Sequence, residues 1–188
     1  MDVKESILQA GAALLKEQGI AALTQPKVAK AAGVKQSHLT YYFPKRADLL
    51  LGIAEHTVEK VTTELAECLD HEPAPAVIAQ TLAAAMIDGI PPRIILGLIV
   101  AADTDPELRV PLSRLIRHVR GRIQRILERA GVADGSNSAL QFHASVVGLA
   151  IMHEAQRTAE SAEELKQGLN GMLRLLGVGI PKTEKDTI

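Results

Sequence analysis

Apolar residues recur at helical spacing along almost the whole chain, and glycine or proline interrupts that spacing at short intervals. No stretch alternates apolar and polar residues in the way that a half-buried strand requires. The pattern therefore predicts an all-α protein. The predicted helices cover about residues 3–18, 24–33, 36–43, 46–69, 75–88, 92–102, 106–130, 137–158 and 161–176.

The chain has 188 residues, enough for one large domain or for a small domain joined to a larger one. No apolar stretch reaches the roughly 18 residues that a membrane span needs, and Met1–Glu5 does not open a signal peptide. The single cysteine, Cys68, excludes an intrachain disulfide and a cysteine-based metal cage. These features predict a soluble protein of the cytoplasm with no membrane partner.

A basic window without acidic residues lies near the N-terminus. The net charge is −1, yet no acid occurs between Glu17 and Asp48, where the cations are Lys27, Lys30, Lys35, Lys45 and Arg46. Three of the four aromatic residues of the chain, Tyr41 to Phe43, also lie in this window. DNA phosphates repel carboxylates and attract lysine and arginine, so the window favours a nucleic-acid partner.

The same window has the form of a helix-turn-helix, two short helices around a turn that contains Gly33. Val34 and Leu39 supply an apolar seam, and glycine permits the left-handed backbone of a tight turn. The polar side of the second helix carries side chains that can hydrogen-bond base edges in a major groove: Gln36, Ser37, His38 and Thr40. By itself the motif is also compatible with an ordinary helical corner, but its coincidence with the basic window favours DNA.

Residues 4–52 resemble the N-terminal domain of TetR-type transcriptional regulators. The resemblance rests on these segments: Glu17-Gln18-Gly19, Leu23-Thr24, Ala31-Ala32-Gly33-Val34, Leu39-Thr40-Tyr41-Tyr42-Phe43 and Lys45-Arg46-Ala47-Asp48-Leu49-Leu50. It implies that the third helix reads the operator, and that the C-terminal helices bind a small effector and form a homodimer. The implied domains are a DNA-binding domain (1–47), an effector-binding and dimerisation domain (48–180) and a flexible tail (181–188).

The resemblance also implies roles for single residues. Gln36, Ser37 and Thr40 fall where the family reads bases, and Thr24, Tyr41, Tyr42 and Arg46 fall where it holds phosphates. The neighbouring lysines Lys27, Lys35 and Lys45 are further phosphate candidates on grounds of charge. The expected function is a repressor that an effector releases from double-stranded operator DNA.

The C-terminal helices predict a dimer face and an effector pocket. The dimer candidates, which could also be plain core residues, are Val146, Leu149, His153, Leu165, Leu169, Met172 and Leu173. The candidate pocket lining is Met86, Leu96, Ile99, Val100, His118, Phe142 and Met152. Because Phe142 is the only aromatic residue of this region, an apolar or acyl-type effector is expected, with His118 as its polar anchor.

Other function classes find little support in the sequence. It contains no phosphate-binding glycine loop, nucleophile elbow or zinc-protease motif, so no catalytic residue, cofactor or metal is predicted. Two alternatives stay open: an architectural DNA-binding protein without an effector, and a helical enzyme or scaffold. The arginines of segment 106–130 are interpreted as a solvated helix flank.

Overall fold

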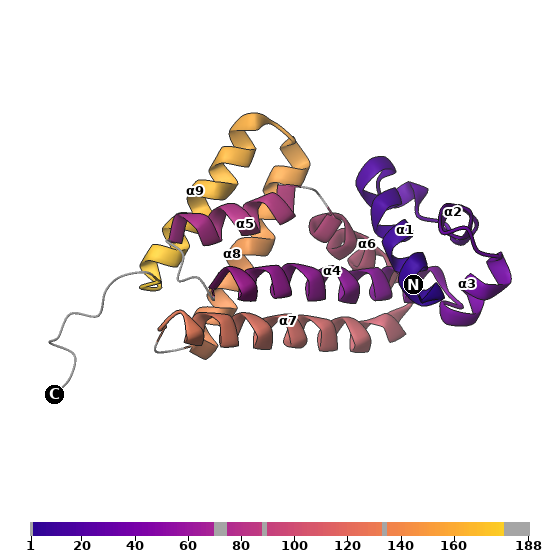
Figure 1. Ribbon diagram of the computed structural model, residues 1–188, viewed down its shortest axis with the longest axis horizontal. Coiled ribbons are helices and arrows are strands. Elements are labelled where there is room, and N and C mark those ends of the chain that lie inside the picture. Colours follow the sequence, from indigo (N-terminus) through magenta and orange to yellow (C-terminus); the bar gives the residue numbers. More distant parts are fainter. Residues whose placement is uncertain (1, 70–74, 88–89, 133–134, 179–188) are drawn as a thin grey trace, which may run out of the picture. The chain divides into compact units, whose positions relative to one another are not determined.

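The computed structural model of the chain describes residues 2–69, 75–87, 90–132 and 135–178, and all regular elements within these ranges are helical (Figure 1). The α-helices are α1 (Val3–Gln18), α2 (Gln25–Ala31), α3 (Gln36–Tyr42), α4 (Arg46–Leu69), α5 (Pro75–Ile87), α6 (Ile90–Thr104), α7 (Arg109–Arg129), α8 (Gly135–Gln156) and α9 (Ala159–Leu175). Two 3₁₀ turns, η1 (Ile20–Ala22) and η2 (Pro106–Leu108), precede α2 and α7. The all-α prediction is confirmed, and each predicted helix has one counterpart.

The largest difference from the predicted helices lies at residue 106. The predicted segment 106–130 opens with η2, and α7 begins only at Arg109. Pro106 starts a 3₁₀ turn, because proline is tolerated in a first turn, where its missing N–H has no intrahelical partner. The predicted tail at 181–188 lies outside the described residues.

The chain packs as two compact units. The first unit comprises Met1–Val61 and Ala85–Val119, and the second comprises Thr62–Ala84 and Arg120–Ile188. The first unit therefore continues beyond the boundary predicted at residues 47 and 48, since α4 places Leu49, Leu50 and Ile53 in its core. The functional boundary stays a prediction.

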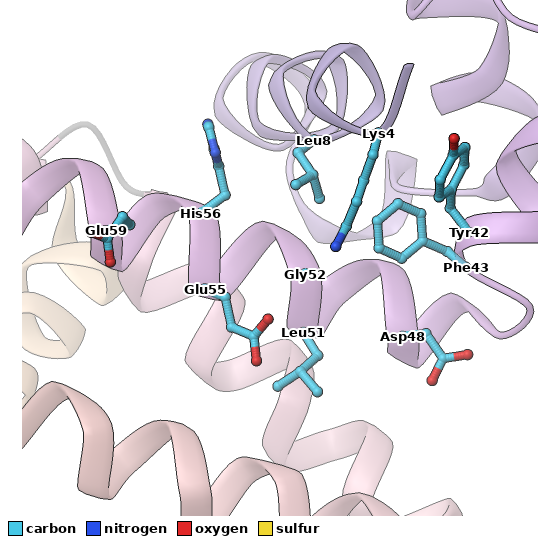
Figure 2. A pocket seen from close by; sticks show the side chains of 10 residues that line it. All are labelled: Lys4, Leu8, Tyr42, Phe43, Asp48, Leu51, Gly52, Glu55, His56 and Glu59. Carbon is cyan, nitrogen blue, oxygen red and sulfur yellow. The ribbon is translucent and has the colours of Figure 1, made fainter. Parts of the chain in front are cut away.

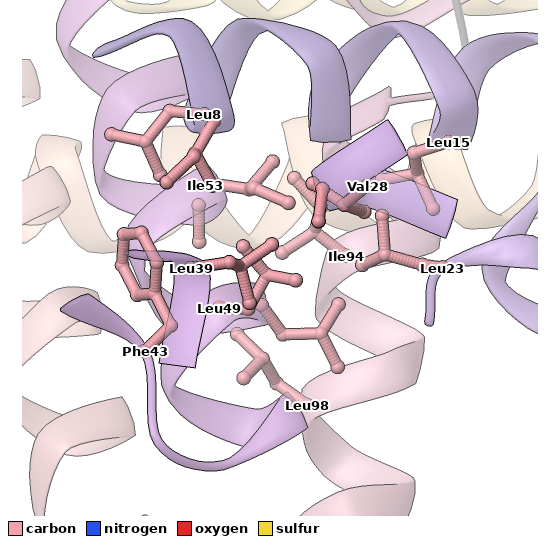
Figure 3. Packing of buried hydrophobic residues seen from close by; sticks show 14 residues of the cluster. Leu8, Leu15, Leu23, Val28, Leu39, Phe43, Leu49, Ile53, Ile94 and Leu98 are labelled. Atoms are coloured by element: carbon pink, nitrogen blue, oxygen red, sulfur yellow. The ribbon is translucent and has the colours of Figure 1, made fainter. Parts of the chain in front are cut away.

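The core of the first unit joins α1 to α4 with α6 (Figure 3). Leu8 and Leu15 of α1, Val28 of α2 and Leu39 of α3 meet Ile94 and Leu98 of α6 in one apolar cluster. α6 approaches closely at Gly97, where a Cβ would lie 2.6 Å from Ile20 Cδ1. Helix α6, which the sequence assigned to the effector domain, is thus part of the same core as the helix-turn-helix.

The second unit is built around α8 and α9. Leu165, Leu169 and Leu173 of α9 are fully buried, as are Phe142 and Ala150 of α8. The turn between the two helices contains a capping box, in which Thr158 Oγ1 accepts from the Ser161 N–H and Ser161 Oγ accepts from the Thr158 N–H. Ser161 Oγ also lies 2.8 Å from the buried His153 Nδ1, which fixes the turn to the end of α8.

Candidate nucleic-acid interface

The turn between α2 and α3 sets the direction of α3. Gly33 has φ +67°, the left-handed conformation that glycine adopts without strain, and the Val34 N–H donates to the Ala29 carbonyl at 3.0 Å. On the far side, Gln25 Nε2 donates to the carbonyl oxygens of Phe43 (2.6 Å) and Pro44 (3.1 Å). The first residue of α2 thereby holds the end of α3.

Helix α3 is anchored from one side only. Its Leu39 is completely buried and Phe43, just after the helix, is nearly so. Seven residues are too few for a stable isolated helix, so this anchoring both forms α3 and orients it. The opposite face is left in solvent, and it carries Gln36, Ser37 and His38.

Thr40 differs from the other base-reading candidates. It is half-buried, and its hydroxyl points to its own helix, 3.1 Å from the Gln36 carbonyl and 3.2 Å from that of Ser37. Its hydroxyl proton is therefore in use, although the oxygen still offers an acceptor lone pair. Gln36, Ser37 and His38 are the more accessible candidates.

Three lysines of the helix-turn-helix, two on α2 and one directly before α3, have no acidic partner in the described residues. Lys27, Lys30 and Lys35 are exposed, and within the described parts of the chain none of them forms an ion pair. Lys30 was not among the predicted phosphate contacts, although the acid-free window already contained it. Thr24 precedes α2 without a capping hydrogen bond from its side chain, so its hydroxyl is also available.

The two tyrosines lie at the end of α3. Tyr41 is 80% exposed and Tyr42 is 38% exposed, and their rings meet edge to face with centroids 5.2 Å apart. Tyr42 also lines an open pocket of about 470 Å³ between α1 and α4, beside Lys4, Phe43 and Asp48 (Figure 2). Both tyrosines are exposed enough to donate a hydrogen bond to a phosphate, but Tyr42 is the less exposed of the two and packs beside the pocket.

Two of the predicted phosphate contacts have internal partners. Arg46 donates from Nε to the Leu23 carbonyl (2.8 Å) and from Nη2 to the Ile20 carbonyl (2.7 Å). Lys45 Nζ lies 3.1 Å from Asp105 Oδ2, and this ion pair raises the pKa of Lys45. In this conformation Arg46 holds the η1 turn and Lys45 is paired with an acid, and the predicted phosphate contacts of both residues stay predictions.

The predicted effector residues are distributed over both units. In the first unit Met86 is buried, whereas Leu96, Ile99 and Val100 lie on the exposed side of α6 because Ile94, Leu98 and Ala102 form its inward side. His118 is exposed, which does not fit a buried polar anchor. In the second unit Phe142 is buried and Met152 is exposed.

A half-buried polar pair, Arg120 and His143, lies in the second unit and was not among the predicted site residues. Burial lowers the pKa of His143, and the charge of Arg120 lowers it further. Arg120 Nε is buried without a hydrogen-bond partner, and Arg120 shares a helix face with Ile123 and Leu127. His143 is half-buried and His118 is exposed. The spacing of apolar residues along the helices did not predict this difference in burial.

The predicted dimer residues mostly face the interior of the single chain. Leu165, Leu169 and Leu173 are fully buried, His153 bonds Ser161, and Val146 is 8% exposed. Leu149 and Met172 are half-buried, and the role of these seven residues in a dimer stays a prediction. An apolar helix stripe does not by itself reveal whether it packs within the chain or between chains.

The described part of the chain contains no group of three or more His, Cys, Asp or Glu placed to hold a metal ion. Within the same residues, no single helix is long and apolar enough to cross a membrane, and only the consecutive pair α5 and α6 reaches that length and composition together.

Comparisons with known proteins agree with this architecture. The family model described as "Bacterial regulatory proteins, tetR family" matches residues 7–53, and that described as "Tetracyclin repressor-like, C-terminal domain" matches residues 93–175. The chain is 30% identical over 175 residues to the HTH-type transcriptional regulator CymR of Pseudomonas putida, covering 88% of this chain and 86% of that protein.

Solved structures share the fold at lower identity. A TetR-family transcriptional regulator from Rhodococcus sp. superimposes with a TM-score of 0.68 at 22% identity, over 93% of this chain and 97% of that one. A transcriptional regulator from Saccharomonospora viridis, solved in complex with choline, gives a TM-score of 0.64 at 17% identity, over 91% of this chain and 95% of that one.

Proposed function

Because this chain belongs to the TetR family of bacterial regulatory proteins and is a DNA-binding transcriptional regulator, we propose that it represses transcription until a small effector releases it from its operator. The observation that carries this proposal is the exposed face of α3. There Gln36, Ser37 and His38 point outward on a helix anchored from behind by Leu39. A short helix that presents hydrogen-bonding side chains can enter a major groove and read base edges.

The lysines around α3 supply the part of the affinity that does not depend on sequence. Lys27, Lys30 and Lys35 are exposed and without acidic partners in the described part of the chain. Each phosphate that a lysine neutralises releases counterions and steepens the dependence of affinity on salt. Lys30 thus joins the predicted phosphate contacts, and Arg46 leaves them for a structural role.

The test separates base reading from phosphate binding. Fluorescence anisotropy is measured with a selected operator and a scrambled duplex at several salt concentrations. Gln36→Ala is expected to reduce the difference between the two duplexes, and Lys30→Ala to weaken both and flatten the salt slope by about one. Lys166→Ala, the same charge change on α9, is the control. Equal behaviour of all three variants would refute this assignment of α3.

The dimer contacts are proposed on the outer face of α8. Leu140, Ala144, Gly148 and Met152 are exposed and four residues apart, so they form one ridge along the helix. Nothing lies within 4 Å of a Cβ placed on Gly148, which leaves room for close approach of a second copy. A dimer is needed because two recognition helices must reach half-sites about 34–36 Å apart.

The effector is proposed to be an apolar molecule with an acidic group. Arg120 brings a positive charge and a buried, unsatisfied Nε–H close to the half-buried imidazole of His143, on a helix face that also carries the buried Ile123 and Leu127. A carboxylate would satisfy that donor and offset the charge. These two residues replace His118 as proposed polar anchors, since His118 is exposed.

Thermal-shift measurements with matched ligand pairs test the effector class. Octanoate and benzoate are compared with their methyl esters, and choline serves as a cationic probe. We expect the acids to stabilise the protein more than the esters, and Arg120→Gln, but not the exposed-site control Arg114→Gln, to abolish that difference. Stabilisation by choline alone would overturn this class. If none of the probes stabilises the protein or weakens its DNA binding, the effector-independent architectural alternative gains support.

A further inference from the structure

Lys45 lies at the junction between α3 and α4, next to the proposed DNA-binding face. Its backbone N–H donates to Asp48 Oδ2 at 2.8 Å, so the main chain of Lys45 is fixed at the start of α4. Its side chain is 60% exposed. The position therefore suits a phosphate contact, as the sequence predicted.

The ammonium group of Lys45, however, has an acidic partner inside the same unit. Nζ lies 3.1 Å from Oδ2 of Asp105, a residue 60 positions further along the chain and directly after α6. The side chain of Asp105 is 30% exposed, half the value of Lys45. Asp105 is thus the more enclosed partner, and Lys45 is the partner that can turn outward.

The backbone around Asp105 is held firmly. Its N–H donates to the Ala101 carbonyl at 2.9 Å, and its carbonyl accepts from the Leu108 N–H at 3.1 Å. At the other end of α6, Arg93 Nη1 donates to the carbonyls of Leu15 (2.7 Å) and Lys16 (2.8 Å) at the end of α1. Arg93 therefore ties the start of α6 to α1, and Ile94 and Leu98 hold the helix in the core of the first unit. Because the main chain of Asp105 continues directly from this helix, its carboxylate stays where Lys45 can reach it.

Lys45 differs in this respect from the lysines around α3. Asp105 raises the pKa of Lys45 by its hydrogen bond and its charge, and Glu107 and Asp48 add to the negative field. Lys27, Lys30 and Lys35 have no ion pair in the described residues. A phosphate group that approaches Lys45 must therefore displace a carboxylate and remain near its charge, which costs free energy that the other lysines do not require.

We infer that Asp105 is an intramolecular competitor of DNA phosphate for Lys45, and that this contact lowers the affinity of the protein for all DNA sequences. The inference rests on the proposed function, because it requires the α3 face to bind DNA. The Asp105 carboxylate at the end of α6 would reduce the number of cationic side chains that the first unit offers to the phosphates of DNA. It thereby adjusts operator affinity without touching a base.

Two substitutions on the same segment, each of which removes one negative charge, test the inference. Asp105→Asn removes the competing charge and nearly preserves the side-chain shape. Asp103→Asn removes the same charge two residues earlier from a side chain that is 71% exposed and 3.6 Å from Arg109. Binding to a mixed-sequence duplex is measured by anisotropy at several salt concentrations. Lys45→Ala and the double variant complete the cycle, and thermal melting confirms that each variant is folded.

If Lys45 is freed to bind phosphate, Asp105→Asn should bind DNA roughly threefold to tenfold more tightly at low salt, and its slope of log affinity against log salt should steepen by about 0.9. Asp103→Asn should leave the slope unchanged, and the gain from Asp105→Asn should vanish in the Lys45→Ala background. An Asp105→Asn protein that binds like the wild type overturns the inference, as does a gain that persists without Lys45 or one that Asp103→Asn matches.

The same experiment distinguishes this inference from the proposed function. If the wild-type protein shows no salt-dependent DNA binding, both the proposed function and the inference about Asp105 are refuted. If the wild-type protein binds DNA with a steep salt dependence and Asp105→Asn binds with the same affinity and slope, only the inference about Asp105 is refuted.

Discussion

Leu39 determines whether the recognition helix exists, so its truncation should affect stability and DNA binding together. The side chain is completely buried between α1, α2 and α4 of the first unit (Figure 3). Leu39→Ala removes three carbon atoms, worth about 0.8 kcal/mol each in transfer free energy, and leaves a cavity that adds to this loss. The expected cost is about 3 kcal/mol of unfolding free energy.

Far-UV circular dichroism during heating measures this loss. For a chain of this size, about 3 kcal/mol corresponds to a fall in melting temperature of roughly 6–12 °C. Leu175→Ala is the matched control, because it makes the same chemical change at a side chain that is 84% exposed. A Leu39→Ala protein that melts within about 1 °C of the wild type, or a Leu175→Ala protein that loses as much, would refute the reasoning.

Three further predictions follow from particular contacts. Arg46→Met should lower the unfolding free energy by about 2 kcal/mol through loss of the bonds to Leu23 and Ile20, while the salt slope of DNA binding stays as in the wild type; a flattened slope would return Arg46 to the phosphate contacts. Burial, and then Arg120, lowers the pKa of His143, so as the pH falls below about 6.5 the unfolded chain takes up a proton before the native protein does. Wild-type stability should therefore fall between about pH 7.5 and 5.5 by more than that of His143→Gln, and parallel melting temperatures would contradict this. Gly148→Leu should shift the dimer toward monomer in light scattering, whereas Ser136→Leu, at an exposed position on another side of α8, should not; two variants of unchanged mass would exclude the α8 ridge.

The sequence by itself determined the helices and the position of the DNA-binding motif. Helix ends can be predicted from the sequence because they depend on nearby residues: Gly19, Gly33 and Pro44 each end a helix within a few residues of their own position. The outward face of α3 follows equally from periodicity, because Leu39 and Phe43 mark the buried side and Gln36, Ser37 and His38 occupy the other.

Only the tertiary structure decided what each helix face meets. The inward leucines of α9 turned out to pack within the chain, and α6 joined the core of the helix-turn-helix. The partners of Lys45, Arg46 and Arg93 lie 60, 23 to 26 and 77 to 78 residues away, respectively. Periodicity reports that a face is apolar or a side chain is charged, but partners so distant along the chain meet only when it folds, and no local pattern records them.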